Sequence, residues 1–367
     1  MKVKTVDDWS EFLSLREQWN LLLRESDHDS IFLSWEWIWN WSQIRLEAIE
    51  PYVLTIYEDE LLVGIAPFYT CDMTAFGTVK LKTLRVLGDY GSAAEYPNFI
   101  SKASNSRAIK TELVNELLST NVPWDCIWLN LMAGWTTAYD ELISVLMSKP
   151  QLFIATRQTD FSYIDISQRE VIEAKLNSGN LGSNLRRFEN GIKKLGVVDV
   201  QYCEDLEEAD YFFNTLTELH KSRWAKKSIV GTFERNPQLA EFYRLIIRDA
   251  LQLNILRFAI LTCDGVPRAA QIGYAYEGVF HVIQEGFDPE FHPGVGNLLR
   301  KYVLESCLKE GLKEYDFLQG ASEHKRRWGA VHRQGYDVIV WRSSLKTLLL
   351  KRLGLWPTGR YLNMANK

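Results

Sequence analysis

Apolar positions recur at two different spacings along this chain, and they predict strands and helices in a fixed order. The segment 279–320 shows both spacings. Residues 279–287 are apolar and aromatic enough for a buried strand. After a Gly/Pro-rich loop, apolar residues recur at helical spacing over 298–308, and a second short strand begins at Tyr315. The segment is therefore predicted to form a strand, a loop, a helix and a strand.

The loop of this segment is Pro293-Gly294-Val295-Gly296-Asn297. A Gly-x-Gly turn that leads into a helix presents free backbone N–H groups and the positive end of the helix dipole, which suits a pyrophosphate. The alternative is that the two glycines only allow a tight turn. The loop is our first candidate for a cofactor site.

Over the whole chain, the patterns predict the order β-α-α-β-β-β-α-β-α-β twice. We therefore expect two similar domains, at residues 1–165 and 166–367. The halves differ at one point. Where the second has its Gly loop, the first has the polar segment 101–107, so a phosphate-bearing cofactor is expected in the second half.

A helix is predicted over 171–195, and its later part carries a basic face that is either solvated or in contact with phosphates. In the first half, four tryptophans alternate between positions 35 and 41. We predict a helix there, because Ser34 is a good cap and the tryptophans form i,i+4 pairs. These rings are expected to pack in a core, and a platform for stacking sugars or bases is the alternative.

Composition narrows the class of protein. A chain of 367 residues with 46% hydrophobic and 24% charged residues is typical of a globular protein with two domains. A net charge of -5 argues against a surface that binds nucleic acid over its whole extent. The six histidines show no metal-ligand spacing, so no metal is expected.

The lack of a targeting signal in the pattern and the usage of cysteine lead us to expect a cytoplasmic protein. The N-terminus has no apolar signal core, and no run of 18 apolar residues predicts a membrane span. The cysteines are odd in number and form no CxxC pair, so we expect reduced core residues. They are Cys71, Cys126, Cys203, Cys263 and Cys307.

Taken together, the motifs resemble a known family. The predicted order and the Gly loop after the fourth strand resemble the GNAT acyltransferase fold, and within it the CelD-like (cellulose- and exopolysaccharide-associated) group, which is related to the FemAB peptidyltransferases. The segments that carry the resemblance run in family order over about 145 residues. They are Leu185-Arg186-Arg187, Lys194-Leu195-Gly196, Leu219-His220-Lys221-Ser222-Arg223-Trp224, Phe287-Asp288-Pro289, Pro293-Gly294, Tyr315-Asp316-Phe317-Leu318-Gln319-Gly320 and His324-Lys325-Arg326-Arg327-Trp328.

The resemblance implies two tandem GNAT-like α/β (α+β) domains, each a mixed, mainly antiparallel sheet flanked by helices. It implies an acetyltransferase-like enzyme of EC class 2.3.1 with acyl-CoA, most simply acetyl-CoA, as co-substrate. The implied cofactor-binding residues are Gln284, Gly286, Phe287, Gly294, Val295, Gly296 and Asn297. One position departs from the family pattern, because Phe291 stands where a basic or amide residue is usual.

Three residues are candidates for catalysis. Glu285 lies near the end of the fourth strand of the second half, and burial can tune a carboxylate toward neutrality, so we favour Glu285 as the base. The alternative is a surface residue at a strand end. His220 can accept a proton near neutral pH, and Asp316 on the fifth strand is a second carboxylate. For both, a structural role is the alternative.

Four residues are candidates for substrate binding. Arg223 and Trp224 share a helix face with His220, and an arginine there can hold a carboxylate or phosphate of the acceptor. The family pattern has a lysine at the position of Lys325, which opens a predicted helix, and an aromatic residue at that of Trp328. We therefore prefer these two as candidates to Arg326 and Arg327, which we expect to be solvated.

The leading hypothesis is an acyl-CoA-dependent N- or O-acyltransferase that modifies a sugar, a sugar nucleotide or another cell-envelope or exopolysaccharide precursor. One alternative is FemAB-like aminoacyl transfer from charged tRNA, and another is a scaffold that has lost the chemistry. The segment 344–356 predicts a basic apolar helix whose leucines pack on the domain; contact with an anionic membrane surface is the alternative. These leucines are Leu345, Leu348, Leu349 and Leu353.

Overall fold

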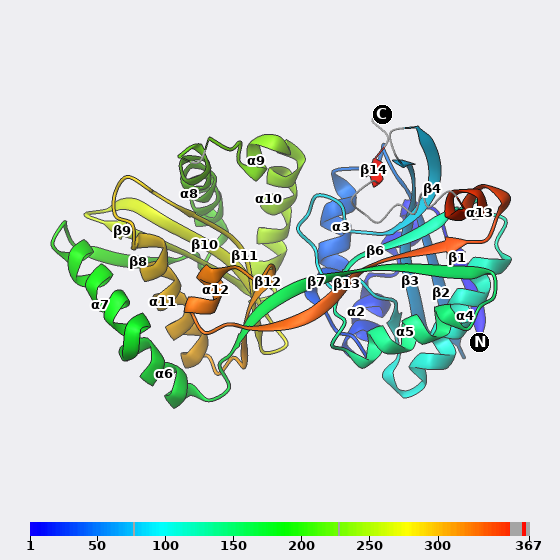
Figure 1. The fold of residues 1–367 in the computed structure, drawn as a ribbon, viewed down its shortest axis with the longest axis horizontal. Coiled ribbons are helices and arrows are strands. Elements are labelled where there is room, and N and C mark those ends of the chain that lie inside the picture. Colours follow the sequence, from blue (N-terminus) through cyan, green and yellow to red (C-terminus); the bar gives the residue numbers. More distant parts are fainter. Residues whose placement is uncertain (76–77, 227, 353–361, 365–367) are drawn as a thin grey trace. The chain divides into compact units, whose positions relative to one another are not determined.

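The computed structural model describes residues 1–75, 78–226, 228–352 and 362–364 (Figure 1). Contacts divide the chain into two compact units. Unit 1 comprises residues 1–160 and the described residues from 333 onward, and unit 2 comprises residues 161–332. In the described part of the chain, no helix is both long enough and apolar enough to cross a membrane.

Unit 1 is a mixed sheet with helices packed on it. Its strands follow the order β1-β2-β3-β4-β6-β13, and only β4 and β6 run parallel. Short strands β5 and β14 pair with β3. The elements are β1 (Lys2–Val6), α1 (Trp9–Leu13), α2 (Arg16–Arg24), α3 (Trp35–Gln43), β2 (Glu50–Glu58), β3 (Leu61–Ala75), β4 (Val79–Val86), β5 (Ile100–Ser101), α4 (Ser106–Ser119), β6 (Cys126–Met132), α5 (Thr137–Met147), β7 (Leu152–Asp165), β13 (Val331–Arg342), α13 (Leu345–Arg352) and β14 (Leu362–Met364), with 3-10 turns at Ile31–Leu33 and Ala103–Asn105.

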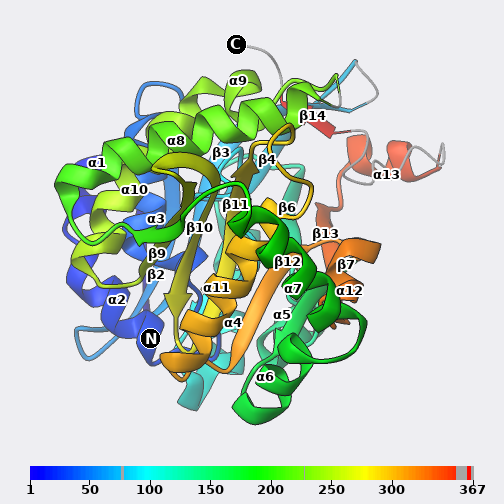
Figure 2. The same ribbon diagram turned by 90° about the vertical axis from the view of Figure 1, so that its left-hand side faces the viewer.

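Unit 2 has the same plan. Its strand order is β7-β12-β11-β10-β9-β8, and only β11 and β12 run parallel. Helices α8 and α10 cover one face, and α11 with α6 and α7 covers the other (Figure 2). The elements are α6 (Arg169–Asn177), α7 (Gly179–Lys193), β8 (Val198–Tyr202), α8 (Leu206–Ala225), α9 (Thr232–Arg235), α10 (Pro237–Gln252), β9 (Leu256–Cys263), β10 (Val266–Tyr276), β11 (Val279–Phe287), α11 (Val295–Lys309), β12 (Glu314–Gln319) and α12 (Glu323–Arg327).

The predicted fold class is confirmed: both units are mixed, mainly antiparallel sheets flanked by helices, and the order of elements repeats. The long helix predicted over 171–195 is wrong in one respect. The chain breaks it into α6 and α7 at Gly179, whose φ of +61° is a conformation that favours glycine.

The last strand of each half completes the sheet of the other unit. Strand β13 pairs antiparallel with β6 in unit 1, and the end of β7 pairs antiparallel with β12 in unit 2. The described residues from 333 onward therefore group with unit 1, whereas the sequence placed 166–367 in one domain. The reason is strand pairing between distant segments, which no local pattern reveals. The first boundary lies at 160/161, against the expected 165/166.

The cores are built from the residues whose spacing predicted them. In α3, Ser34 caps the helix by accepting from Trp37 N–H, and Trp35, Trp37 and Trp41 are buried. The prediction of core packing for these rings is confirmed. Four of the five cysteines are buried and Cys71 is half-buried, and all five are free thiols.

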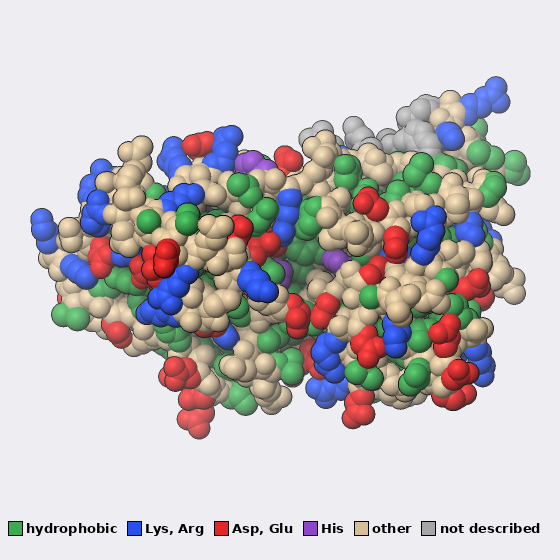
Figure 3. Space-filling view, turned by 90° about the horizontal axis from the view of Figure 1, so that it is seen from below, with side chains coloured by type: hydrophobic (Ala, Val, Ile, Leu, Met, Phe, Trp, Pro, Cys, Tyr) green, Lys and Arg blue, Asp and Glu red, His purple; other side chains and the backbone are tan. Residues whose placement is uncertain are grey.

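Helix α13 corrects the prediction for the tail. Leu345 is 92% exposed, and Leu348 and Leu349 are also exposed, whereas Leu350 is buried. Three of the leucines predicted to pack, Leu345, Leu348 and Leu349, therefore face solvent. The fourth, Leu353, and the rest of the predicted stretch to 356 lie outside the described residues. On the face of the molecule drawn in Figure 3, acidic and basic side chains are interspersed.

Candidate functional site

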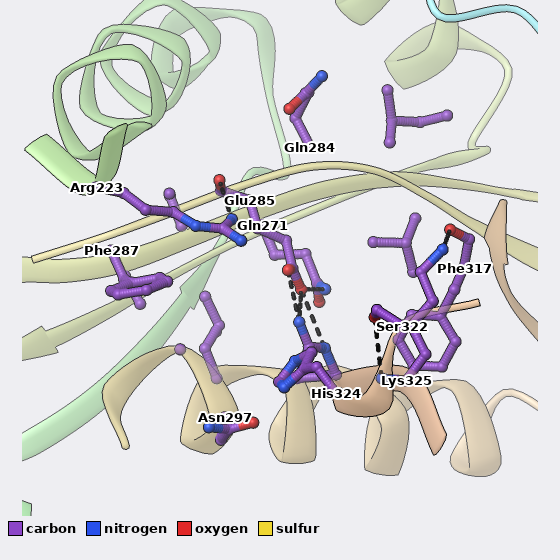
Figure 4. A pocket seen from close by; sticks show the side chains of 18 of the residues that line it. Arg223, Gln271, Gln284, Glu285, Phe287, Asn297, Phe317, Ser322, His324 and Lys325 are labelled. Atoms are coloured by element: carbon purple, nitrogen blue, oxygen red, sulfur yellow. Dashed lines mark hydrogen bonds and ion pairs between the residues drawn. The ribbon is translucent and has the colours of Figure 1, made fainter. Parts of the chain in front are cut away.

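The end of β11 sends its side chains alternately to the two faces of the unit 2 sheet. A Cβ on Gly286 would lie 2.5 Å from His220 N in α8, so Gly286 allows close packing of that helix on the strand. Glu285, next to it, reaches Arg300 of α11 on the opposite face. Gln284 points away from Glu285 (Figure 4).

A pocket opens where β11 and β12 separate. Their parallel pairing joins 279–281 to 314–316 and goes no further, although β11 continues to Phe287. The pocket has a volume of about 640 Å³ and lies within unit 2. Its walls come from β10, the end of β11, the first turn of α11, β12 and α12 (Figure 4).

A buried ion pair lines this pocket. Arg300 Nη2 lies 2.6 and 2.5 Å from the two oxygens of Glu285, and Arg300 Nε lies 3.1 Å from Oε1. Gln271 Nε2 donates to Glu285 Oε1 (2.6 Å) and to the hydroxyl of Tyr315 (3.0 Å). Burial by itself raises the pKa of Glu285, but the charge and hydrogen bonds of Arg300 outweigh it, and the pKa is lowered.

This direction contradicts the reasoning that favoured Glu285 as a base. We expected burial to bring the carboxylate toward neutrality, and the sequence did not show that Arg300 faces it. The carboxylate is held ionised by the guanidinium, with both oxygens occupied. Glu285 lines the pocket as one half of an ion pair.

His220 lies outside the pocket lining. It is 2% exposed, and its Nε2 accepts a hydrogen bond from Trp224 Nε1 (2.9 Å). Burial and the nearby charge of Arg223 lower the pKa of His220 to about 4. The ring is therefore neutral at physiological pH, and its Nε2 is occupied by the indole N–H, as in a structural histidine.

Asp316 also lies outside the pocket lining. It is fully buried, accepts from Leu318 N (2.8 Å) and lies 3.6 Å from His281 Nδ1. Leu318 has a φ of +59°, so the carboxylate supports an irregular strand end. This contact fits the structural alternative.

Arg223 is one of two predicted substrate-binding residues that line the pocket. It extends from α8 and donates from Nη1 to the carbonyl of Glu285 (3.1 Å), and its guanidinium lies 5.0 Å from the centroid of the Phe287 ring. Burial lowers the pKa of Arg223. Trp224 is half-buried beside it and does not line the pocket.

Lys325 lines the pocket, but its ammonium is occupied by the backbone at the end of β12. Four carbonyl oxygens surround it, those of Phe317 (2.9 Å), Leu318 (3.2 Å), Gln319 (2.6 Å) and Gly320 (3.1 Å). Trp328 is buried outside the lining and donates from Nε1 to Asn297 Oδ1 (3.1 Å). Both residues thus hold the walls of the pocket in place.

Only part of the Gly loop lines the pocket. Gly296 and Asn297, in the first turn of α11, line the pocket together with Gln284, Gly286 and Phe287. Gly294 and Val295 do not. A Cβ on Gly294 would lie 2.2 Å from the Phe188 ring of α7, so this glycine serves packing, and Val295 is fully buried.

Phe291, the loop residue that departs from the family pattern, packs against Arg268 of β10. The Arg268 guanidinium lies 4.3 Å from the centroid of the Phe291 ring and pairs with Asp288 (2.7 Å). A positive charge therefore lies beside the loop although the loop position itself is aromatic.

Sequence reasoning missed Gln271, Arg300 and His324, which all line the pocket. Arg300 donates to His324 Nε2, and burial and the Arg300 charge lower the pKa of His324 to about 4. One signal in the sequence could have pointed to Arg300. It stands three and four residues before Val303 and Leu304, so a charged residue falls on the apolar, core-facing stripe of its helix. No three or more His, Cys, Asp or Glu side chains gather as a metal site in the described ranges.

Comparisons with known proteins agree with this fold. Residues 180–326, which include the pocket, match the family described as Acetyltransferase (GNAT) domain. No curated protein matches the chain in sequence. The structure of FemX has a TM-score of 0.62 at 10% identity, covering 96% of this chain and all of FemX.

Two further solved structures are similar. One is the C-terminal domain of a putative lysylphosphatidylglycerol synthetase from Agrobacterium fabrum, with a TM-score of 0.55 at 9% identity, covering 93% of this chain and 95% of that one. The other is L-PGS from Bacillus licheniformis, with a TM-score of 0.52 at 13% identity. The match covers 94% of this chain and 96% of that one. At such identities the likeness establishes the fold, and membership of the CelD-like group stays a prediction.

Proposed function

We propose that unit 2 is an acyltransferase site of the GNAT type that takes an acyl group from acyl-CoA and passes it to an amine or hydroxyl. The observation that carries this proposal is the pocket between the separated ends of β11 and β12, which reaches the first turn of α11. The match of residues 180–326 to the GNAT domain family supports it.

In the proposed reaction, the acceptor nitrogen or oxygen attacks the thioester carbonyl carbon, and the carbon–sulfur bond breaks. CoA leaves as the thiolate with the electron pair of that bond, and the proton lost by the acceptor ends on its sulfur, directly or through solvent, to give the thiol. The start of α11 offers N–H groups at Gly296 and Asn297 to the pyrophosphate. Phe287 and Arg223 form the adjoining wall.

This proposal assigns some of the predicted residues to binding of the acyl donor and none to proton transfer. Gln284, Gly286, Phe287, Gly296 and Asn297 bound the donor site, because they line the pocket. The structural contacts described above leave no free proton acceptor on the side chains predicted as catalytic. We propose that the site works chiefly by positioning the reactants, with solvent in the pocket receiving the proton.

The acceptor is proposed from the resemblance as a sugar, sugar nucleotide or other cell-envelope or exopolysaccharide precursor. A second candidate function is aminoacyl transfer from tRNA. The observation that favours it is the exposed basic surface of α7 and its C-terminal end, which carries Arg186, Arg187 and Lys194.

A thermal-shift experiment tests the donor. Acetyl-CoA at 100 times its dissociation constant is expected to stabilise the protein by about 2.7 kcal/mol. Gly296→Leu places a side chain at the pocket wall, where a Cβ meets the Phe287 ring at 3.0 Å, and is expected to abolish the shift. Gly294→Leu is less informative, because it collides with Phe188.

Lys309→Leu is the matched control, since Lys309 is exposed at the other end of the same helix. A shift with charged tRNA and none with any CoA compound would favour the second candidate. No shift with either, in a folded protein, would favour a scaffold and contradict both.

A further inference from the structure

The amide of Gln271 has an orientation that chemistry determines. The carboxylate of Glu285 is held ionised by Arg300, so it accepts hydrogen bonds only. The Gln271 group that lies 2.6 Å from Glu285 Oε1 must therefore be the NH₂ group. The same nitrogen donates to the hydroxyl of Tyr315. The amide oxygen consequently points away from both partners.

That amide oxygen is left without a partner. Gln271 is 2% exposed and lines the pocket, and its Oε1 accepts no hydrogen bond from any residue that the structure describes. A buried carbonyl oxygen without a donor is unfavourable, and such atoms are rare in folded proteins. An N–H or O–H group of a ligand in the pocket would relieve this cost.

The charge near Gln271 indicates which kind of donor fits. Arg223, Arg300 and Lys325 bring three positive charges to the pocket wall, and Glu285 brings one negative charge that is paired with Arg300. An ammonium group would meet a net positive surrounding, whereas a neutral hydroxyl or amide N–H would not.

We propose that the acyl group transferred by this protein carries a neutral hydrogen-bond donor, a hydroxyl or an amide N–H, which binds Gln271 Oε1 in the pocket. The inference rests on the proposed function, since it concerns the acyl donor of that same site. Simple saturated acyl chains and aminoacyl groups are then poorer ligands than hydroxyacyl groups of equal length.

Calorimetric titration with three matched thioesters tests this inference. They are butyryl-CoA, 3-hydroxybutyryl-CoA and β-alanyl-CoA, which differ in offering no donor, a neutral donor and an ammonium. We expect 3-hydroxybutyryl-CoA to bind at least about tenfold more tightly than the other two, because only it satisfies Gln271 without adding positive charge. Equal affinities, or tighter binding of either other thioester, would overturn the inference.

Gln271→Met keeps the size of the side chain and removes the acceptor, and it is expected to abolish the preference. Gln201→Met, at an exposed position of β8, should retain it. If Gln271→Met weakens the binding of free CoA as much as that of the thioesters, the hydrogen-bond donor to Gln271 belongs to the CoA part of the ligand, and the inference is wrong. Should the variant not fold, the comparison of thioesters on the natural protein still decides.

The two proposals fail in different ways. If none of the three thioesters binds, the proposed function is contradicted. If all three bind without preference, the proposed function stands and only the inference about the acyl group is lost.

Discussion

The two units share one plan and differ at the point where their parallel strands end. In unit 1, β4 pairs with β6 through Arg85, one residue before β4 ends. In unit 2, the pairing of β11 with β12 ends at His281, six residues before β11 ends at Phe287. Beyond His281 the end of β11 stays paired with β10 but has no partner in β12, and the pocket lies there. We infer that the separation of these two strands is what gives unit 2 its candidate site.

A buried ion pair stands near this point in both units, with different surroundings. Arg85 pairs with Asp89 (2.9 Å), its guanidinium lies 4.4 Å from the centroid of the Trp128 ring, and Tyr69 donates to Asp89. There the pair is enclosed by rings. The Glu285–Arg300 pair lines an open pocket instead. We infer that the first pair serves stability and the second serves both stability and binding.

The largest effect is expected from Arg85→Met in unit 1. Both partners of this pair are less than 10% exposed, and the substitution leaves the Asp89 carboxylate buried without its counter-charge. We expect a loss of about 3–5 kcal/mol in the free energy of unfolding, measured by denaturant titration. The stabilisation by acetyl-CoA should persist in the folded variant, and Arg85→Met with Asp89→Asn should recover much of the loss.

A somewhat smaller loss is expected from Arg300→Met, about 3 kcal/mol, because Glu285 is 19% exposed and water partly compensates. This variant should also lose the stabilisation by acetyl-CoA, unlike Arg85→Met. Glu285→Gln in addition should restore stability but not binding. Retained binding in the single variant would show that the two pairs have the same role.

The smallest effect concerns pH and the structural histidine of unit 2. Because the pKa of His220 is lowered to about 4 from an ordinary 6.5, the unfolded chain binds more protons than the folded one between these values. Stability should therefore fall as pH falls through that range, by roughly 2 kcal/mol between pH 7 and pH 5. His220→Asn should reduce this slope, and an unchanged slope would contradict the structural assignment.

Local patterns were enough to predict much of the fold. The cap at Ser34, the apolar stripe of α11 and the repeated order of elements all depend on neighbours in sequence. The exchange of β7 and β13 could not be predicted, since those pairings join residues more than 140 positions apart. Strand alternation did place Gln284 and Glu285 on opposite faces.

The site was predicted in part for the same reason. Of the residues that follow from one local motif, those at the end of β11 line the pocket together with Gly296 and Asn297, whereas Gly294 and Val295 do not. Gln271 donates to Glu285 from β10, and the charges of Arg300 and His324 lower its pKa from two other elements, so these contacts depend on tertiary structure. The carbonyls around Lys325 were hidden in the same way, because backbone groups carry no signal in sequence.

The stoichiometry of acetyl-CoA binding tests the contrast between the two units most directly. Isothermal titration should give one molecule per chain, and none for Gly296→Leu, because the strands separate into a pocket in unit 2. Two molecules per chain would mean that the paired strands of unit 1 also hold a donor. One molecule that persists in a folded Gly296→Leu protein would place the donor elsewhere and contradict the account.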